Sequence, residues 1–222
     1  MIIKFSFLNV TKKLKYLINK SESHQNNLKV IFLLHGYGSN EEDLYSLKEF
    51  FPSNYITISL RAPISIGLNS YAWYSINFEN NIDRWIDCDE AISSKNIIIN
   101  DITLHLKDLA FTNENVSILG FSQGAILSWS IGIEYPNLIK NILPLSGFYH
   151  SEITETNLNS KYRINSFSTH GINDPVIPIN WARRGIQSLN KYNINIEFKE
   201  YQSGHEINND NLRDVISWLD IN

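Results

Sequence analysis

The chain has 222 residues, of which 43% are hydrophobic and 19% are charged, and its formal net charge is −4. This length predicts a single domain over residues 1–222, and the composition provides for a substantial core. The pI of about 5.9 and the mean hydropathy of −0.21 argue against nucleic acid as a partner and against a transmembrane segment.

The N-terminal residues mix lysines with alternating apolar side chains. They lack the continuous apolar core and the small-residue cleavage site of a signal peptide. We therefore expect a cytoplasmic protein. Cys88 is the single cysteine, which excludes an intramolecular disulfide framework and a cysteine-based zinc site.

The first half of the chain contains candidate strands of two kinds. Alternating apolar residues around 2–8 and 12–19 favour two antiparallel strands. The continuous apolar run at 29–36 is typical of a strand that is buried on both faces, and 55–60 is the next strand candidate.

Ser39 and Glu42 have the spacing of a capping box, so we expect a helix from there to about Phe51. A long irregular stretch is expected after Pro63. Further along, the patterns predict helices at 90–110, 123–135, 180–193 and 209–220, and strands at 115–121, 139–147, 163–171 and 195–202. Strands alternating with helices predict an α/β fold, with a mostly parallel central sheet, an antiparallel N-terminal edge and helices on both faces.

A serine between two glycines lies where a predicted strand becomes a predicted helix. The stretch Gly120-Phe121-Ser122-Gln123-Gly124 matches the G-x-S-x-G nucleophile elbow. Such a turn lifts the serine out of the sheet, and the glycines leave room for closely approaching segments. The helix also directs its N-terminal N–H groups toward developing negative charge. The alternative is a plain turn without chemistry.

A serine nucleophile needs a base, and the base needs an orienting acid. In the elbow architecture these follow in the order Ser, Asp or Glu, His. Asp174 is the only aspartate between Ser122 and His205, and His205 is the only histidine after Asp174. We expect these three residues on three successive loops at carboxyl ends of strands. The alternatives are a turn-forming Asp174 and a surface-loop His205, and His170 is interpreted as structural.

Attack on a carbonyl group produces an oxyanion, which needs preorganised N–H donors. One predicted donor is the backbone N–H of Gln123, which directly follows the serine. The other is the backbone N–H of Tyr37, in the loop 35–40 after a buried strand. Gly36 and Gly38 would let this loop turn tightly, and the alternative is a strand-to-helix loop without chemistry.

Several motifs occur in one order from about residue 30 to the C-terminus: LLHGYGSNEEDL, RAP at 61–63, AWY at 72–74, LGFSQGA, LPLSGF, HGINDPVIP and GHEI. Together they resemble the small α/β-hydrolases of the carboxylesterase, lysophospholipase and acyl-protein thioesterase family. The resemblance implies the α/β-hydrolase fold and the same triad and oxyanion donors. It also implies that Trp73, Phe148 and Val176 lie near the acyl group of a substrate.

The stretch between Phe148 and Arg163 is too short for a large cap domain, so we expect an open site. The segment 62–80 is the remaining candidate for a cover. Its aromatic side chains either line an acyl groove or only pack the loop on the body; they are Tyr71, Trp73, Tyr74 and Phe78.

Acidic residues precede the helix predicted at 90–110. A metal site formed by Asp87, Asp89 and Glu90 is conceivable. We prefer the interpretation that these carboxylates favour the helix dipole, and we therefore expect no metal site. Cys88, without a nearby histidine, is interpreted as structural.

The main hypothesis is a serine hydrolase that cleaves carboxylic esters through an acyl-enzyme, as a carboxylesterase or lysophospholipase. No cofactor is expected, and the partner is a small-molecule or lipid-like acyl ester. An acyl-protein thioesterase is the nearest alternative. A noncatalytic α/β-hydrolase that binds a ligand or partner is the alternative of another class, and a peptidase is a weaker one. The oligomeric state is left open.

Overall fold

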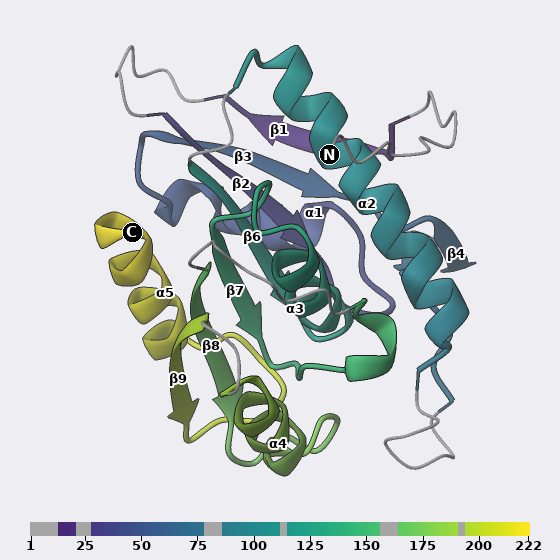
Figure 1. Ribbon diagram of the computed structural model, residues 1–222, viewed down its shortest axis with the longest axis vertical. Coiled ribbons are helices and arrows are strands. Elements are labelled where there is room, and N and C mark those ends of the chain that lie inside the picture. The colour runs from purple at the N-terminus through teal and green to yellow at the C-terminus, as the bar shows by residue number, and fades with distance from the viewer. Residues whose placement is uncertain (1–12, 21–27, 78–85, 112–114, 156–163, 191–193) are drawn as a thin grey trace, which may run out of the picture.

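A seven-stranded sheet forms the centre of the computed structural model, in the order β1-β3-β2-β6-β7-β8-β9 (Figure 1). The structure describes residues 13–20, 28–77, 86–111, 115–155, 164–190 and 194–222. The strands of this sheet are β1 Tyr16–Asn19, β2 Lys29–Leu34, β3 Tyr55–Leu60, β6 Val116–Phe121, β7 Asn141–Leu145, β8 Ile164–Gly171 and β9 Ile194–Tyr201. β1 is antiparallel to β3 and the other neighbouring pairs are parallel, which confirms the predicted sheet.

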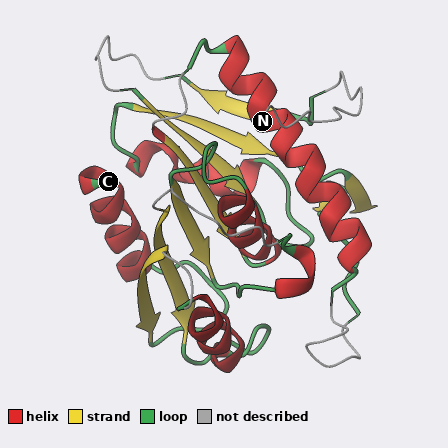
Figure 2. Ribbon diagram, in the orientation of Figure 1, coloured by secondary structure: helices red, strands yellow, loops and turns green. Residues whose placement is uncertain are grey.

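Helices cover both faces of the sheet (Figure 2). The α-helices are α1 Glu42–Tyr45, α2 Cys88–Asp108, α3 Gln123–Glu134, α4 Ile179–Leu189 and α5 Asn209–Ile221. Two short 3₁₀ helices, η1 Ser46–Phe50 and η4 Ser151–Ile153, complete the helical elements named here. The predicted α/β architecture is therefore confirmed.

The side chains of β2 divide the core between the two faces. Val30, Phe32 and Leu34 belong to a cluster that includes residues of α2 and α3. Ile31 and Leu33 point the other way, into a cluster with residues of α1 and α5. Because successive residues of a strand face opposite sides, a strand covered on both faces must be apolar throughout.

The helix predicted from Ser39 to Phe51 is shorter than expected and is capped differently. The Ser39 hydroxyl donates to Asp43 Oδ2 at 2.7 Å, and the Glu42 N–H is accepted by Asn40 Oδ1 at 2.8 Å. Only the four residues of α1 are α-helical, and the chain then tightens into η1. The predicted capping box is therefore wrong, because the neighbouring asparagine takes the N–H group.

A two-stranded hairpin lies where an irregular stretch was predicted. Its strands are β4 Ile64–Gly67 and β5 Ser70–Ala72, and they form an antiparallel sheet of their own. Asn69, at the turn, has a positive φ of 52°, a conformation that asparagine tolerates better than most residues. The strand predicted at 2–8 lies outside the described residues.

The carboxyl ends of the parallel strands carry the predicted catalytic residues. Ser122 follows β6, Asp174 follows β8 and His205 follows β9. The sequence predicted three successive loops. This is wrong, because β7 and its loop lie between β6 and β8. The prediction overlooked the loop that follows the strand it placed at 139–147. All three catalytic loops still open on one edge of the sheet, where α/β proteins place their sites.

Candidate active site

Ser122 occupies the sharp turn between β6 and α3. Its φ of 54° and ψ of −114° lie in a region that is strained for a residue with a side chain. A Cβ atom on Gly120 would lie 2.2 Å from the Gly124 carbonyl oxygen, and one on Gly124 would lie 2.1 Å from the Leu34 carbonyl oxygen. The two glycines therefore let α3 start directly against β6 and β2, as the elbow motif predicts.

Ser122, His205 and Asp174 form a continuous hydrogen-bonded chain. His205 Nε2 lies 2.9 Å from Ser122 Oγ, and His205 Nδ1 lies 2.6 Å from Asp174 Oδ2. An ionised carboxylate only accepts hydrogen bonds, so the ring hydrogen lies on Nδ1 and the Nε2 lone pair faces the hydroxyl group. Ser122 and Asp174 are each 7% exposed, whereas the His205 side chain is 16% exposed.

Asp174 is surrounded by hydrogen-bond donors. Its Oδ1 accepts from the N–H groups of Val176 and Ile177, each at 2.8 Å. His170 Nε2 lies 3.3 Å from Oδ2, which also contacts His205. Burial alone would raise the pKa of Asp174, but the hydrogen bonds from His170, His205 and the Ile177 N–H outweigh it and hold the pKa well below its ordinary value. The carboxylate is therefore ionised at neutral pH.

The loop at residues 36–41, which we call the oxyanion loop, lies beside Ser122. A Cβ atom on Gly36 would lie 3.4 Å from Ser122 Cβ, so the loop backbone passes close to the serine. Tyr37 is the next residue of this loop, and Gln123 is the first residue of α3. The two N–H groups predicted to stabilise an oxyanion thus belong to segments that flank the serine, and their action remains a prediction.

The Gln123 side chain has a second role, which the motif did not predict. Its Oε1 accepts from the Trp73 N–H at 2.8 Å, and its Nε2 donates to the Tyr74 carbonyl at 2.6 Å. Gln123 is fully buried, so this amide joins the start of α3 to the segment after β5. The sequence signal for this role is the amide side chain next to the serine, because an amide can both donate to and accept from a backbone segment.

The residues expected near an acyl group differ in exposure. Val176 is 44% exposed, whereas Phe148 is 2% and Trp73 is 0% exposed. Trp73 Nε1 donates to the His35 carbonyl at 2.9 Å, and Tyr74 is also fully buried. For these two aromatic residues the structure favours packing of the loop on the body. Substrate contact by the three predicted residues remains a prediction, which the exposure of Val176 favours most.

One other aromatic residue considered for the groove, Phe78, lies outside the described residues. Tyr71 belongs to β5 and is partly buried. Phe148 forms an edge-on contact with Trp181, with ring centroids 5.4 Å apart. Because Trp181 lies on α4, this contact joins the loop after β7 to that helix.

Asp87 caps α2, and Asp89 and Glu90 lie in its first turn. Asp87 Oδ1 accepts from the Glu90 N–H at 3.0 Å, and Glu90 Oε2 accepts from the Ser75 N–H at 2.6 Å. The position of the three carboxylates at the start of α2 agrees with the dipole interpretation, and the Glu90 bond also ties the helix to Ser75. Within the described residues, no group of three or more His, Cys, Asp or Glu side chains is placed to hold a metal ion.

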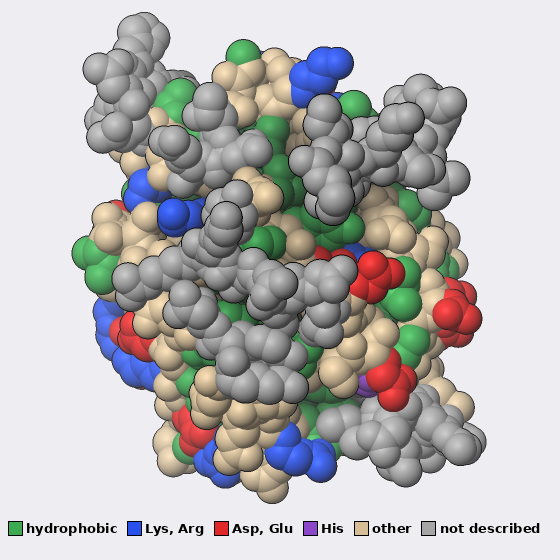
Figure 3. All heavy atoms as spheres, in the orientation of Figure 1, with side chains coloured by type: hydrophobic (Ala, Val, Ile, Leu, Met, Phe, Trp, Pro, Cys, Tyr) green, Lys and Arg blue, Asp and Glu red, His purple; other side chains and the backbone are tan. Residues whose placement is uncertain are grey.

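The charged surface is mixed in sign. On the face drawn in Figure 3, the coloured lysine and arginine side chains are interspersed with aspartate and glutamate. Among the helices of the described residues, none is both long and apolar enough to cross a membrane.

The strand-turn-helix at Ser122, the sheet order and the Ser122–His205–Asp174 contacts define an α/β-hydrolase with the side-chain arrangement of a serine hydrolase. The model of the phospholipase/carboxylesterase family matches residues 16–222. The chain belongs to this family.

Known proteins are similar over most of the chain. An acyl-protein thioesterase 1 of Kluyveromyces lactis is 26% identical over 209 residues, which cover 86% of this chain and 90% of that protein. An acyl-protein thioesterase 1 of Saccharomyces cerevisiae is 31% identical over 158 residues, 67% of either chain. The crystal structure of a Bacillus cereus carboxylesterase aligns with a TM-score of 0.81 at 20% identity, over 96% of this chain and 95% of that one. At such low identity the structural likeness establishes the fold.

Proposed function

We propose that this protein is a serine hydrolase that cleaves carboxylic esters. The observation that carries the proposal is the chain of contacts from Ser122 Oγ through His205 to Asp174, at 2.9 and 2.6 Å. The first length allows proton transfer from Ser122 to His205, and the second lets Asp174 orient the ring and stabilise its cation. Membership of the phospholipase/carboxylesterase family supports the same reaction class.

In the proposed mechanism Ser122 Oγ attacks the acyl carbon while His205 Nε2 removes the hydroxyl proton. The imidazolium then gives this proton to the leaving alcohol, and His205 next activates a water molecule that hydrolyses the acyl-enzyme. Asp174, ionised because of its hydrogen bonds, fixes the ring tautomer and stabilises the imidazolium. The backbone N–H groups of Tyr37 and Gln123 donate to the oxyanion. Every step uses groups of this chain and water.

The substrate class is a small-molecule or lipid-like acyl ester, and the cytoplasm remains the predicted location of the protein. A hydrolysis assay with a short-chain p-nitrophenyl ester tests the proposal. Ser122→Ala should lower turnover by a factor on the order of 10⁶. Ser217→Ala is a matched control, because this exposed hydroxyl lies on α5 and donates to the Arg213 carbonyl. Equal rates for wild type and Ser122→Ala would instead favour the noncatalytic alternative.

A thioesterase is the second candidate, since the K. lactis and S. cerevisiae relatives are both named acyl-protein thioesterase 1. Both reactions pass through the same acyl-enzyme, so the acyl half of the site does not separate them. An oxygen ester and a thioester of the same acyl chain distinguish the two activities, because they differ only in the leaving group. A clear excess of kcat/KM for the thioesters would select the thioesterase.

A further inference from the structure

The backbone on both sides of Tyr37 is tied to the segments that follow β3 and form β5. Before Tyr37, the His35 ring bridges two backbone groups: Nε2 accepts from the Ala62 N–H at 3.0 Å, and Nδ1 lies 2.7 Å from the Gly36 carbonyl. Because a backbone N–H can only donate, Nε2 carries no hydrogen and Nδ1–H donates to Gly36. Burial lowers the pKa of His35, which keeps the ring in this neutral form.

After Tyr37, the oxyanion loop pairs with β5 as if it were a third strand of the hairpin. The Gly38 N–H donates to the Tyr71 carbonyl, and the Tyr71 N–H donates to the Ser39 carbonyl, each at 2.9 Å. The Ser70 hydroxyl adds a bond to the Gly38 carbonyl at 2.7 Å. The predicted oxyanion donor therefore lies on a short stretch that is held at both ends.

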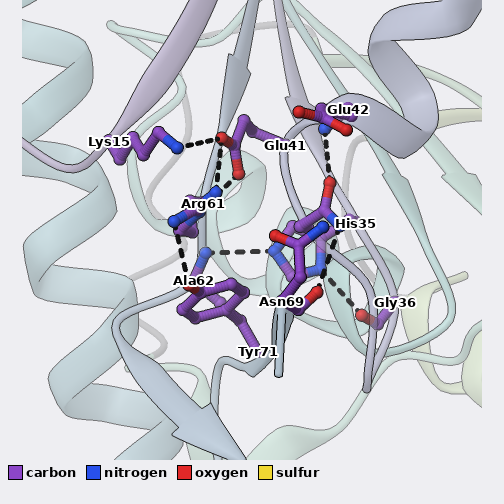
Figure 4. Close-up of polar contacts among 10 residues, drawn as sticks. Lys15, His35, Gly36, Glu41, Glu42, Arg61, Ala62, Asn69 and Tyr71 are labelled. Atoms are coloured by element: carbon purple, nitrogen blue, oxygen red, sulfur yellow. Dashed lines mark hydrogen bonds and ion pairs between the residues drawn. The ribbon is translucent and has the colours of Figure 1, made fainter. Parts of the chain in front are cut away.

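One partly buried ion pair connects both of these attachments (Figure 4). Arg61 Nε and one terminal nitrogen bind the two carboxylate oxygens of Glu41 at 2.5 and 2.7 Å. The other terminal nitrogen donates to the Tyr71 hydroxyl at 2.9 Å, and the guanidinium lies 4.3 Å from the centre of the Tyr71 ring. Arg61 also directly precedes Ala62, the partner of His35.

The carboxylate of this ion pair is buried, and its guanidinium is mostly covered. The Glu41 side chain is 1% exposed and that of Arg61 is 16% exposed, and Lys15 Nζ lies 3.2 Å from Glu41 as a second cation. Burial would raise the pKa of Glu41, but its hydrogen bonds with Arg61 and Lys15 lower it overall. A planar guanidinium that binds a carboxylate through two bonds allows one relative orientation. Because Glu41 is the last residue of the oxyanion loop, this orientation fixes the position of the loop's end.

We propose that Arg61, through Glu41 and Tyr71, is a positioning residue that holds the Tyr37 N–H in place for the oxyanion. This inference rests on the proposed function, since it gives Tyr37 a role in the same reaction. Arg61 does not touch the reacting atoms. It fixes Tyr71 and the end of the oxyanion loop, and its own chain fixes the Ala62–His35 contact.

The test is Arg61→Gln in the full chain, assayed with a short-chain p-nitrophenyl ester. We expect kcat to fall about 10- to 100-fold with KM changed by less than about 3-fold, because the oxyanion exists only beyond the ground state. Affinity for a boronic acid that forms a tetrahedral adduct with the serine should fall in step. Arg61→Lys keeps the charge but not the two-bond geometry, so its kcat should lie between those of wild type and Arg61→Gln.

Arg183→Gln is a matched control. Arg183 binds Glu200 through the same two-bond geometry, at 2.7 and 2.6 Å, on α4 and β9. Its loss should leave kcat within about 2-fold of wild type. If Arg61→Gln does not fold, Tyr71→Phe removes only the hydroxyl group that Arg61 contacts, and a 2- to 5-fold loss of kcat is expected at about unchanged KM.

Hydrogen exchange of the backbone amides separates a failure of this inference from a failure of the proposed function. Faster exchange at residues 36–41 in Arg61→Gln, with unchanged exchange at 118–125, supports the positioning role. Normal kcat in a folded Arg61→Gln variant, or unchanged exchange in the loop, overturns it. If the wild type is no faster than Ser122→Ala, the proposed function fails, and the loop exchange alone then decides whether Arg61 anchors the loop.

Discussion

His170 and Asp174 are in direct contact, with Nε2 of the ring 3.3 Å from Oδ2 of the carboxylate. The same Nε2 lies 2.8 Å from the Ile177 carbonyl, so it carries the ring hydrogen and shares it between two acceptors. His170 is fully buried at the end of β8. It therefore joins the start and the end of the turn that presents Asp174 to His205.

Replacing His170 by alanine should slow the reaction by misplacing Asp174. Loss of one hydrogen bond to a charged group costs about 1.5–3 kcal/mol, so we expect kcat to fall about 10-fold or more. His170→Gln keeps an N–H donor at a similar reach and should recover part of this loss. Steady-state kinetics with parallel thermal unfolding checks the prediction. A folded alanine variant with normal kcat would contradict it.

Asp174→Asn tests the role of the carboxylate itself. An amide can donate to Nδ1, which would move the ring hydrogen to Nε2 and remove the base that faces Ser122, so turnover should fall by about 10⁴. Asp210→Asn is the control, since Asp210 is an exposed residue of α5 paired with Arg213. A near-normal rate for Asp174→Asn would mean that another group orients His205.

The low pKa of Asp174 also makes a prediction about acid stability. A carboxyl group whose pKa is lower in the folded state stabilises the fold above its unfolded pKa, about 3.9, and this contribution is lost as the pH falls toward the folded value. The contribution should shrink by about 1.4 kcal/mol for each pH unit below about 4. Urea unfolding of wild type and Asp174→Asn between pH 6 and 3 measures it. A stability difference that does not change with pH would refute this assignment.

The central sheet and the three residues of the candidate triad could be predicted from the sequence because their signals are local or ordered. The continuous apolar run of β2 indicates burial on both faces, and the glycines around Ser122 indicate the close approach of α3. Asp174 and His205 follow from chain order alone. None of these predictions required knowing which distant segments of the chain pack together.

The supporting contacts could not be predicted in the same way. Nothing in the sequence pairs Glu41 with Arg61. Only the docking of the hairpin on the oxyanion loop brings them together and buries the Glu41 carboxylate. The sequence indicates for His170 only a structural residue at a strand end, because the turn that returns Ile177 to it is a tertiary feature. A single sequence carries no signal for contacts that exist only after the segments have packed.

Val176 is the predicted substrate residue that a substrate can reach, being 44% exposed. Val176→Ala removes apolar surface but keeps the N–H bond to Asp174. We expect kcat/KM to fall about 3- to 10-fold for long acyl chains and to stay unchanged for acetate, since each buried CH₂ group is worth about 0.8 kcal/mol. An acyl-chain-length series measures this, with the exposed Ile221→Ala as control. Equal effects on every chain length would place Val176 outside the acyl site.

Gly124 tests the architecture under the serine. A Cβ atom at this position would lie 2.1 Å from the Leu34 carbonyl oxygen and 2.8 Å from the Leu34 Cβ. Backbone cannot yield as a flexible side chain can, so Gly124→Ala must push α3 away from β2 and displace Ser122 from His205. We expect a loss of more than about 3 kcal/mol of stability, or failure to fold.

Gly67→Ala is the matched control for this substitution, because a Cβ atom there would meet Ser70 Cβ at an ordinary 3.6 Å. Thermal unfolding of both variants, followed by the ester assay on whatever folds, compares a crowded glycine with an uncrowded one. If Gly124→Ala were as stable and as active as Gly67→Ala, the close packing of α3 on β2 would not be what places Ser122.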